Sequence, residues 1–313
     1  MKLAILYAGQ GAQKAGMGLD MYEKYPEFSK RIDDISGAAG FDLKAAMFGK
    51  DESLLQQTEV TQPALAAYAS AVTAVLTAHG IEPDCVAGLS LGEYSALSAA
   101  GVFDPRTLIS LTAFRGKVMA RAGEGIDSLM CAVLGLQSEQ VEEIAAQAEK
   151  ETGCMCRVVN YNTVGQEVLS GLHEGVKRAE ELARAAGCKR CMELKVSSAF
   201  HTPFMESASQ ALKEHFPEVP FGKMNIPVYF NATGTLLPEN ETISDMLVRQ
   251  VKSPVRMKQT ILNMAENGVD TWIEVGPGHA LSGFVKRALP GTDALFINDT
   301  ETLEEVLRTY GKA

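Results

Sequence analysis

A serine flanked by two glycines lies between a short apolar run and a stretch of small residues, and reads Gly88-Leu89-Ser90-Leu91-Gly92. This Gly-x-Ser-x-Gly spacing is typical of a nucleophile elbow, a strand-to-helix turn so sharp that neighbouring side chains must be minimal. The serine would then lie at a helix N-terminus, where free backbone N–H groups, including that of Leu91, favour a developing oxyanion. A structural turn with a capping serine is the alternative, and the pattern alone leaves it open.

The five histidines include the candidates for the general base that a serine nucleophile needs. His201 lies in "VSSAFHTPF", after a predicted strand and just before a proline that suits the first turn of a helix. Open α/β sheets place their ligands at the carboxyl ends of strands, so His201 is the leading candidate. His279 follows Gly-Pro-Gly in a predicted loop and comes second. The others lie at a helix end or beside charged helical surface: His79, His173 and His215.

Arg115 is a candidate for binding a carboxylate. It lies in the predicted helix "LISLTAFRGKVMA", where most neighbours are apolar or small. A guanidinium can hold a carboxylate through two parallel hydrogen bonds, which makes arginine the side chain suited to this task. The ordinary alternative is a charge on a helix surface, and the sequence position alone does not decide between the two.

Net charge and short motifs argue against several kinds of partner and cofactor. The formal net charge is −10, whereas binding to phosphates needs a basic face, so no nucleic-acid partner is expected. The segment "GQGAQ" (9–13) fits neither G-x-G-x-x-G nor the Walker pattern, so no nucleotide cofactor is expected. Six cysteines are present, and the spacings Cys154-x-Cys156 and Cys188-x-x-Cys191 match no standard zinc site. We therefore expect free thiols and no metal.

The hydropathy pattern predicts neither a membrane span nor a signal peptide. No uninterrupted apolar run reaches the ~18 residues that a membrane helix needs. The N-terminal "MKLAILYAGQG" lacks the longer apolar region and the small-residue cleavage site of a signal peptide, so we interpret it as a buried strand. These features favour a cytoplasmic protein without a membrane partner.

Alternating strands and helices predict an α/β fold in the first part of the chain. The predicted strands are residues 2–8 and 85–88, and the predicted helices are residues 63–79, 93–101 and 106–122. Pro63 suits the first turn of its helix. This alternation is typical of a parallel sheet that is covered by helices on both faces.

The pattern changes near residue 127. The predicted elements then run strand, helix, strand, strand, helix, strand, at residues 128–135, 137–151, 154–162, 166–172, 174–187 and 188–197. This order over about 70 residues is the βαββαβ pattern of ferredoxin-like modules. We expect a small subdomain of residues 127–197, inserted into a larger one made of residues 1–126 and 198–313. The last third adds predicted helices at 203–215, 242–251 and 254–267, and strands at 226–232 and 271–278.

Taken together, these segments resemble the malonyl-CoA:acyl carrier protein transacylase family of fatty-acid synthesis. The matching pieces occur in the family's order along nearly the whole chain: GQGAQ (9–13), TQPAL (61–65), GLSLGEYSAL (88–97), FRGKVM (114–119), NYN (160–162), SSAFH (197–201), Gln250 with SPVRM (253–257), and EVGPG (274–278). As a set they are highly specific. The resemblance implies an α/β-hydrolase-like core with an inserted ferredoxin-like subdomain, in agreement with the change of pattern.

The resemblance also implies roles for individual residues. Ser90 would be the nucleophile and His201 the base, positioned by a backbone carbonyl of Gln250 rather than by a carboxylate. The backbone N–H groups of Gln10 and Leu91 would form the oxyanion hole. No metal and no cofactor is implied.

Further implied residues concern the substrate. Arg115 would bind the malonyl carboxylate, Gln62 and Gln250 would line the site, and Phe200 fits relatives that exclude a 2-methyl branch. One position departs from the family, which usually has histidine directly before the nucleophile, where this chain has Leu89. That histidine is thought to line the acyl pocket, so we expect Leu89 to alter substrate contacts without removing the base.

The implied reaction is a ping-pong transfer of malonyl from malonyl-CoA to the phosphopantetheine thiol of holo-acyl carrier protein, through a malonyl-serine. Three alternatives stay open on the sequence. One is a serine hydrolase or thioesterase on the same scaffold. Another is a non-catalytic, carrier-binding relative in which Leu89 marks loss of activity. The third is a discrete acyltransferase of polyketide synthesis.

Acyl carrier protein is strongly acidic, as is this chain, so docking needs a local basic patch rather than a favourable net charge. The candidates lie in the inserted subdomain and near the expected cleft: Lys177, Arg178, Arg184, Lys189, Arg190, Lys286 and Arg287.

Overall fold

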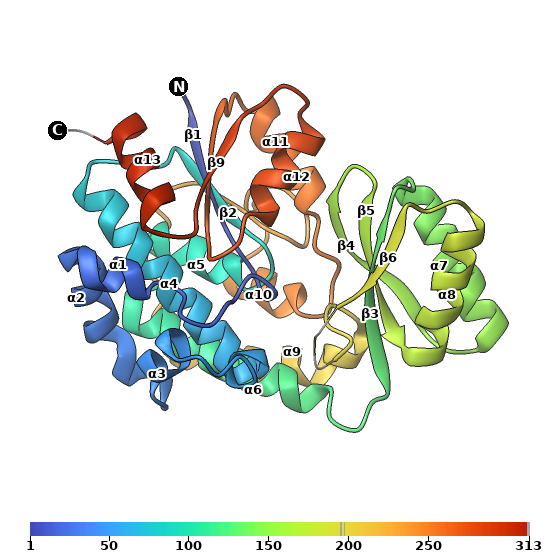
Figure 1. The fold of residues 1–313 in the computed structure, drawn as a ribbon. Helices are drawn as coiled ribbons and strands as arrows, with labels where there is room; N and C mark the ends of the chain where they lie inside the picture. Colours follow the sequence, from blue (N-terminus) through green and yellow to red (C-terminus); the bar gives the residue numbers. More distant parts are fainter. Residues whose placement is uncertain (195, 197, 312–313) are drawn as a thin grey trace.

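The computed structural model describes residues 1–194, 196 and 198–311, and its strands form two sheets (Figure 1). The larger sheet has five strands in the order β7-β2-β1-β8-β9, and the smaller has four in the order β4-β5-β3-β6. The predicted α/β class, with a parallel sheet and a second ferredoxin-like sheet, is confirmed.

The larger sheet is parallel throughout. Its strands are β1 (Leu3–Tyr7), β2 (Cys85–Gly88), β7 (Val228–Tyr229), β8 (Thr271–Val275) and β9 (Ala294–Ile297). Every residue of β1 is buried, and alternate side chains join two different hydrophobic clusters, Ile5 and Tyr7 in one and Ala4 and Leu6 in the other. Both faces of this sheet are therefore covered, as a parallel sheet requires.

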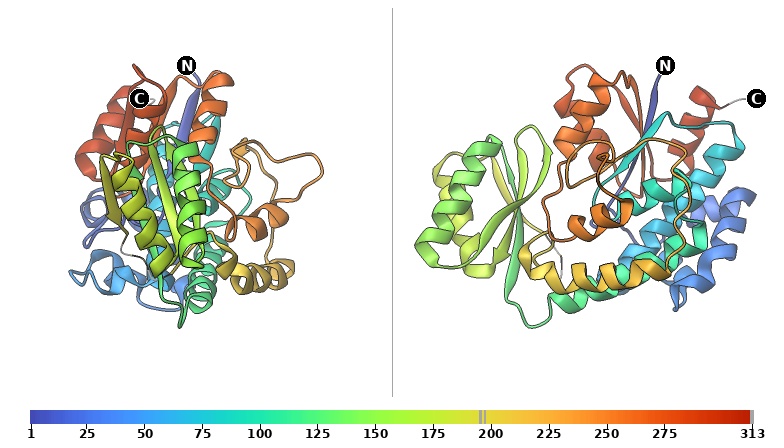
Figure 2. Two further views of the ribbon diagram at one scale, coloured as in Figure 1. Left: turned by 90° about the vertical axis from the view of Figure 1, so that its right-hand side faces the viewer. Right: turned by 180° about the vertical axis from the view of Figure 1, so that it is seen from behind.

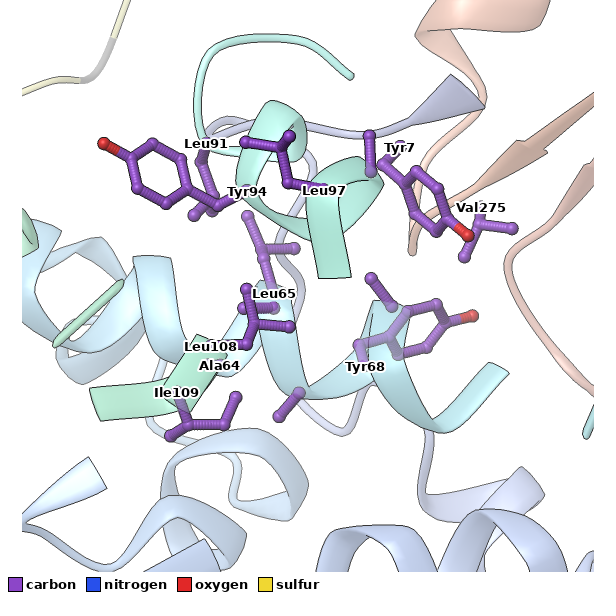
Figure 3. Packing of buried hydrophobic residues seen from close by; sticks show 14 of the residues in the cluster. Tyr7, Ala64, Leu65, Tyr68, Leu91, Tyr94, Leu97, Leu108, Ile109 and Val275 are labelled. Atoms are coloured by element: carbon purple, nitrogen blue, oxygen red, sulfur yellow. The ribbon is translucent and has the colours of Figure 1, made fainter. Parts of the chain in front are cut away.

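Eleven α-helices accompany this sheet within the described residues. They are α1 (Leu19–Lys24), α2 (Pro26–Ile35), α3 (Leu43–Phe48), α4 (Thr58–Ala78), α5 (Gly92–Ala99), α6 (Pro105–Ala122), α9 (Glu206–His215), α10 (Ile243–Gln250), α11 (Met257–Glu266), α12 (Ala280–Ala288) and α13 (Thr300–Tyr310). Figure 3 shows Leu91, the residue after Ser90, in one core with Tyr94 and Leu97 of α5, Leu65 of α4 and Leu108 of α6. The turn that carries the candidate nucleophile therefore rests on a close-packed base.

The smaller sheet belongs to a βαββαβ unit. Its elements are β3 (Ser128–Leu134), α7 (Ser138–Thr152), β4 (Cys156–Thr163), β5 (Gln166–Leu172), α8 (His173–Ala185) and β6 (Arg190–Glu193). Helices α7 and α8 cover the outer face, away from the larger sheet (Figures 1 and 2). Along β3, Cys131 and Val133 join the cluster beneath these helices, whereas Met130 and Ala132 join the main core cluster. The inner face of the small sheet is thus directed at the larger subdomain.

Most predicted elements differ from the structure by up to three residues at an end, and three differ the most overall. The helix predicted to begin at residue 63 begins at Thr58, so Pro63 lies inside it. The proline removes one helical hydrogen bond, but residues before it, including Val60 and Gln62, are buried and keep the helix in place. The strand predicted at 226–232 is reduced to β7, and the one predicted at 188–197 to β6. Residues 195 and 197 of the latter lie outside the described residues.

Helix α4 is long and apolar enough to cross a membrane by length and composition. However, 83% of its most apolar window is buried inside the fold. We therefore interpret α4 as the central core helix, packed against α2, α5 and α6.

Hydrogen bonds tie the two subdomains together at one end of the space between them. The N–H of Val255 donates to the carbonyl of Val159 on β4 over 2.8 Å, and the N–H of Tyr161 donates back to the carbonyl of Val255 over 2.9 Å. The hydroxyl of Thr163 donates to the carbonyl of Phe284 on α12 over 2.9 Å. The boundaries at 126/127 and 197/198 themselves stay a prediction.

Candidate active site

A cavity of about 440 Å³ lies between the two subdomains. The larger subdomain contributes Gly9, Gln10, Gln62, Leu89, Ser90, Leu91, Arg115, Phe200 and His201, and the smaller contributes Met130, Ala132, Asn160, Asn162, Val168 and Met192. Polar groups that could do chemistry therefore lie on one wall, and the opposite wall is mostly apolar. This is the arrangement expected of a site that binds a largely apolar ligand and orients it with a few polar groups.

Ser90 lies in the turn between β2 and α5, and its φ angle is 53°, in the left-handed region that side chains rarely adopt. A Cβ atom added to Gly88 would collide with the carbonyl of Gly92, and one added to Gly92 would collide with the carbonyl of Tyr7. The two glycines are therefore required by close approach of the backbone, as the nucleophile-elbow motif predicts.

The hydroxyl of Ser90 is hydrogen-bonded to an imidazole. Its Oγ lies 2.8 Å from Nε2 of His201, and Nδ1 of the same ring lies 2.9 Å from the backbone carbonyl of Gln250. A carbonyl can only accept, so Nδ1 carries the proton and Nε2 is left to accept the serine proton. Within the described residues, Ser90 and His201 (φ 61°) are the only two non-glycine residues with positive φ.

His201 has the properties of a base that is neutral at physiological pH. Burial, and then the nearby charge of Arg115, lower the pKa of His201 to about 4. The carbonyl of Gln250 lies at the C-terminal end of α10, where the helix dipole is negative and favours an imidazolium once it forms. The ring is thus unprotonated before reaction and is stabilised when it takes a proton.

Arg115 is almost fully buried, with 1% of its surface exposed. Its Nη1 donates to Oε1 of Gln62 over 2.7 Å, and its Nη2 donates to Oε1 of Gln250 over 2.9 Å and to Oγ of Ser90 over 3.2 Å. The guanidinium also lies over the ring of Tyr94, 5.1 Å from its centroid. Among the described residues no carboxylate forms an ion pair with it. Neutral amides hold the cation in place and leave its charge available to an anion.

Gln10 and Leu91, predicted to supply oxyanion donors, both line the cavity. Within the part of the chain that the structure describes, neither backbone N–H donates a hydrogen bond to the protein. The side chain of Gln10 is held by a bond from Nε2 to Oγ1 of Thr58, over 3.1 Å. Two free N–H groups beside the serine can therefore receive a negative oxygen.

The remaining predicted residues lie close to this centre. Gln62 and Phe200 are buried in the cavity wall, and Gln250 lies directly behind it, bonded to Arg115. Leu89 is half-buried, lines the cavity and packs against the second hydrophobic cluster. His279, the second candidate for the base, lies apart as the N-cap of α12, with its ring 5.4 Å from that of Phe296.

Some residues of the site were not predicted individually. Asn160 and Asn162 project from one face of β4 into the cavity, and Oδ1 of Asn162 is buried without a partner among the described residues. Successive side chains of a strand point to opposite faces, so the spacing of the two asparagines in the NYN motif could have placed both on one face.

Asn231 accepts a hydrogen bond from the N–H of Ser90 over 2.6 Å, and Glu93 is fully buried beneath the turn. Nothing in the local pattern marked Asn231.

The cysteines lie away from this centre. Sγ of Cys188 lies 3.5 Å from Sγ of Cys191, both half-buried, while Cys156 is buried and Cys154 half-buried. In the described residues no group of three or more His, Cys, Asp or Glu side chains is placed to hold a metal ion.

The geometry suits nucleophilic attack on an acyl group that carries a second, negatively charged end. Ser90 attacks, His201 takes its proton, two N–H groups receive the oxyanion, and Arg115 lies within hydrogen-bond distance of the nucleophile. No carboxylate contacts the base in the described part of the chain, so this differs from a Ser-His-Asp triad.

Comparisons with known proteins agree with this chemistry. The acyl transferase domain family matches residues 5–296. The malonyl CoA-acyl carrier protein transacylase of Bacillus subtilis is 35% identical over 308 residues, covering 98% of this chain and 97% of that protein. The crystal structure of MCAT from Streptococcus pneumoniae is 40% identical, has a TM-score of 0.92, and is matched over 99% of this chain and 100% of that one.

A third similar protein was solved with a partner. It is a malonyl-transacylase in complex with its type II PKS acyl-carrier protein, 35% identical to this chain, with a TM-score of 0.94. The match covers 99% of this chain and 100% of that one.

The lowered pKa of His201 leads to a prediction about pH. The imidazole must be neutral to accept a proton, so reactivity is present above its pKa and lost as pH falls through it. We expect the rate at which a fluorophosphonate labels Ser90 to be level near neutrality and to fall with a midpoint near pH 4. Labelling is followed by intact-protein mass spectrometry, with Ser90→Ala as the unlabelled control and circular dichroism at each pH. A midpoint near 6.5, the ordinary value, would show that the ring is not desolvated.

Proposed function

The chain belongs to the acyl transferase domain family and, within it, to the malonyl CoA-acyl carrier protein transacylases, and on that basis we propose that it transfers malonyl from malonyl-CoA to the phosphopantetheine thiol of an acyl carrier protein. The observation that carries this proposal is the position of Arg115, a buried cation without an ion-pair partner in the described residues, 3.2 Å from the Ser90 hydroxyl. One small group with a carboxylate at one end and a thioester at the other can contact both.

In the first half-reaction, Nε2 of His201 takes the proton of Ser90 as Oγ attacks the thioester carbonyl. The carbonyl oxygen becomes negative between the N–H groups of Gln10 and Leu91, and loss of one such donor typically costs about 10²-fold or more in rate. The tetrahedral species collapses, the thiol of CoA leaves with the proton from His201, and malonyl remains as an ester on the serine.

In the second half-reaction, the carrier's thiol gives its proton to His201 and attacks the same ester carbonyl. Ser90 leaves with that proton, and malonyl is carried away as a new thioester. Water must be excluded from the malonyl-serine ester until the carrier binds, because water would hydrolyse the ester. The apolar wall of Met130, Val168 and Met192 helps to exclude it. No metal or organic cofactor takes part in this scheme.

Arg115 accounts for the preference for a dicarboxylic acyl group. An acetyl group would leave the guanidinium facing apolar surface, and an unpaired buried charge costs far more than a missing methylene. Phe200, buried at the cavity next to His201, limits the room for a branch at the second carbon of the acyl group. Leu89 adds apolar contact at the position directly before the nucleophile.

Only part of the candidate docking patch carries free charge. Lys177, Arg178 and Arg184 each form an ion pair with a glutamate of the same subdomain. Lys189 and Arg190 are exposed, and the structure gives them no ion pair among the residues it describes. Lys286 and Arg287 on α12 are likewise exposed and have no ion pair among the described residues, so these four side chains best match the carrier's acidic surface.

The free charges gather at one end of the small sheet. Leu134 of β3 is paired with Gln166 on one side and with Arg190 on the other. Gln166 lines the cavity and accepts a hydrogen bond from Arg287 over 3.0 Å. Arg190 and Arg287 thus lie at the same rim of the cleft, and an acidic carrier bound there has its arm at the cavity mouth.

We place this reaction in the cytoplasm and in fatty-acid elongation. The similar protein solved with a type II PKS acyl-carrier protein makes a polyketide carrier the second candidate acceptor.

Intact mass spectrometry tests the proposed function. Mixing the protein with malonyl-CoA should add one malonyl group to Ser90, and holo-acyl carrier protein should remove it and become malonylated. Ser90→Ala should gain nothing. Offering fatty-acid and polyketide carriers in parallel identifies the acceptor. An adduct that is lost as fast to water as to either carrier indicates a hydrolase and contradicts the proposal.

Replacing Arg115 tests the carboxylate clamp. Arg115→Ala should lower kcat/KM for malonyl-CoA by about 10²–10³-fold, equivalent to about 3–4 kcal/mol, because two charge-assisted hydrogen bonds are lost. Transfer of acetyl relative to malonyl should rise. Arg121→Ala, near the exposed end of the same helix, is the matched control and should leave both rates unchanged. If Arg115→Ala keeps wild-type malonyl kinetics, the clamp is wrong.

Charge reversal tests the docking patch. The double variant Lys189→Glu/Arg190→Glu should raise the apparent KM for the carrier by about tenfold and leave that for malonyl-CoA unchanged, since steering by surface charge acts on the acidic partner. Lys30→Glu/Arg308→Glu makes the same change of charge on exposed positions of α2 and α13, far from the small sheet (Figure 1). An equal effect in both variants would assign the change to net charge and exclude the patch.

A further inference from the structure

Asn231 has all four of its hydrogen-bonding groups engaged, although nothing in the proposed mechanism uses it. Its side-chain Oδ1 accepts from the N–H of Ser90 over 2.6 Å, and its Nδ2 donates to the carbonyl of Gly88 over 2.7 Å. Its backbone N–H donates to Oε2 of Glu93 over 2.5 Å, and its carbonyl accepts from the N–H of Arg256 over 2.9 Å. The residue is fully buried.

The position of Asn231 follows from the larger sheet. Strands β2 and β7 pair in parallel, with Val86 opposite Val228 and Ala87 opposite Tyr229. Continuing this register brings residue 231 alongside the turn that carries Ser90, at the carboxyl ends of both strands. One side chain can therefore bridge the residue before the turn and the nucleophile itself.

This bridge acts where the backbone is strained. Ser90 has a φ of 53°, which costs free energy for a residue with a side chain and persists only where surrounding contacts enforce it. Asn231 binds the N–H of Ser90 and the carbonyl of Gly88, the two polar backbone groups that flank the turn. Fixing them sets both the direction of Oγ and that of the following N–H, on Leu91.

The same residue is anchored to the elements that carry the rest of the site. Glu93 lies in α5, which begins directly after the turn, and burial raises the pKa of this glutamate to about 8. Arg256 follows the segment whose Gln250 carbonyl holds His201. Asn231 therefore connects the nucleophile's turn with the support of its base.

We propose that Asn231 is a positioning residue that holds the strained turn so that Oγ of Ser90 meets His201 and the N–H of Leu91 faces the oxyanion. It acts through the backbone and touches no substrate. The inference rests on the proposed malonyl transfer, since Ser90 must be the nucleophile for its position to matter.

The first test separates turnover from binding. Asn231→Ala removes both side-chain bonds, and we expect the maximal rate of Ser90 malonylation to fall by about 100-fold, as for a misplacement of about 1 Å. The half-saturating concentration of malonyl-CoA should stay within about twofold, because no hydrogen bond among the described residues joins Asn231 to Arg115 or Gln62. Asn263→Ala is the matched control, since Nδ2 of Asn263 also donates to a glycine carbonyl, that of Gly234, over 2.8 Å, away from Ser90.

A second variant keeps the proposal testable if the alanine variant does not fold. In Asn231→Asp, the protonated carboxyl can donate to the Gly88 carbonyl and accept from the Ser90 N–H, as the amide does. Burial raises the pKa of such a carboxyl, so it is protonated at low pH and ionises as pH rises. The ionised carboxylate oxygen then faces the Gly88 carbonyl oxygen and repels it. Because this displaces the turn, we expect the malonylation rate to be about tenfold lower at pH 8.5 than at pH 6. The wild-type rate should not fall over this range.

The outcomes are distinct. An Asn231→Ala protein that is folded and within threefold of the wild-type rate overturns the proposal, as does an Asn231→Asp protein whose pH profile parallels the wild type. A slower Asn263→Ala protein would assign the loss to general destabilisation and also overturn it. If wild-type protein gains no malonyl on Ser90, the proposed function fails instead, before any variant is compared.

Discussion

The hydrogen bond between Ser90 Oγ and His201 Nε2 is the contact on which the rest of the site depends. Its two residues come from positions 90 and 201, and both adopt a left-handed backbone that only strong surrounding contacts can maintain. On the serine side, the support comes from close glycine packing and from Asn231. On the histidine side, it comes from the carbonyl that ends α10. The larger fold brings the Oγ atom of Ser90 and the Nε2 atom of His201, both on residues with a strained backbone, to 2.8 Å from each other.

The charge of Arg115 links substrate recognition to the strength of the base. This charge lowers the pKa of His201, after the larger effect of burial. In the proposed reaction, a carboxylate bound to Arg115 neutralises that influence, so the imidazole becomes a better proton acceptor when a substrate of the right charge is present. An uncharged acyl group lacks this effect. In the proposed reaction, selectivity therefore arises in the chemical step as well as in binding.

Local motifs and periodicity were sufficient to predict the fold class, and they marked Ser90 and His201 as candidates. Glycines around Ser90 and the strand before His201 are short-range signals, and the βαββαβ order is visible as alternating periods. The true start of α4 was not predictable, because burial of residues before Pro63 outweighs the local effect of proline. Asn231 was missed for a related reason. It is 141 positions from the residue it holds, and only the pairing of β2 with β7 brings them together.

The hydrophobic character of α4 has a consequence for biosynthesis. By length and composition alone, this segment of a nascent chain resembles a membrane-spanning helix. The helices that shield it, α2, α5 and α6, all lie within residues 26–122, so they emerge from the ribosome close to it in time. These helices are translated before β7, β8 and β9, so they can cover α4 early. This order shortens the time for which the apolar surface of α4 is exposed during synthesis.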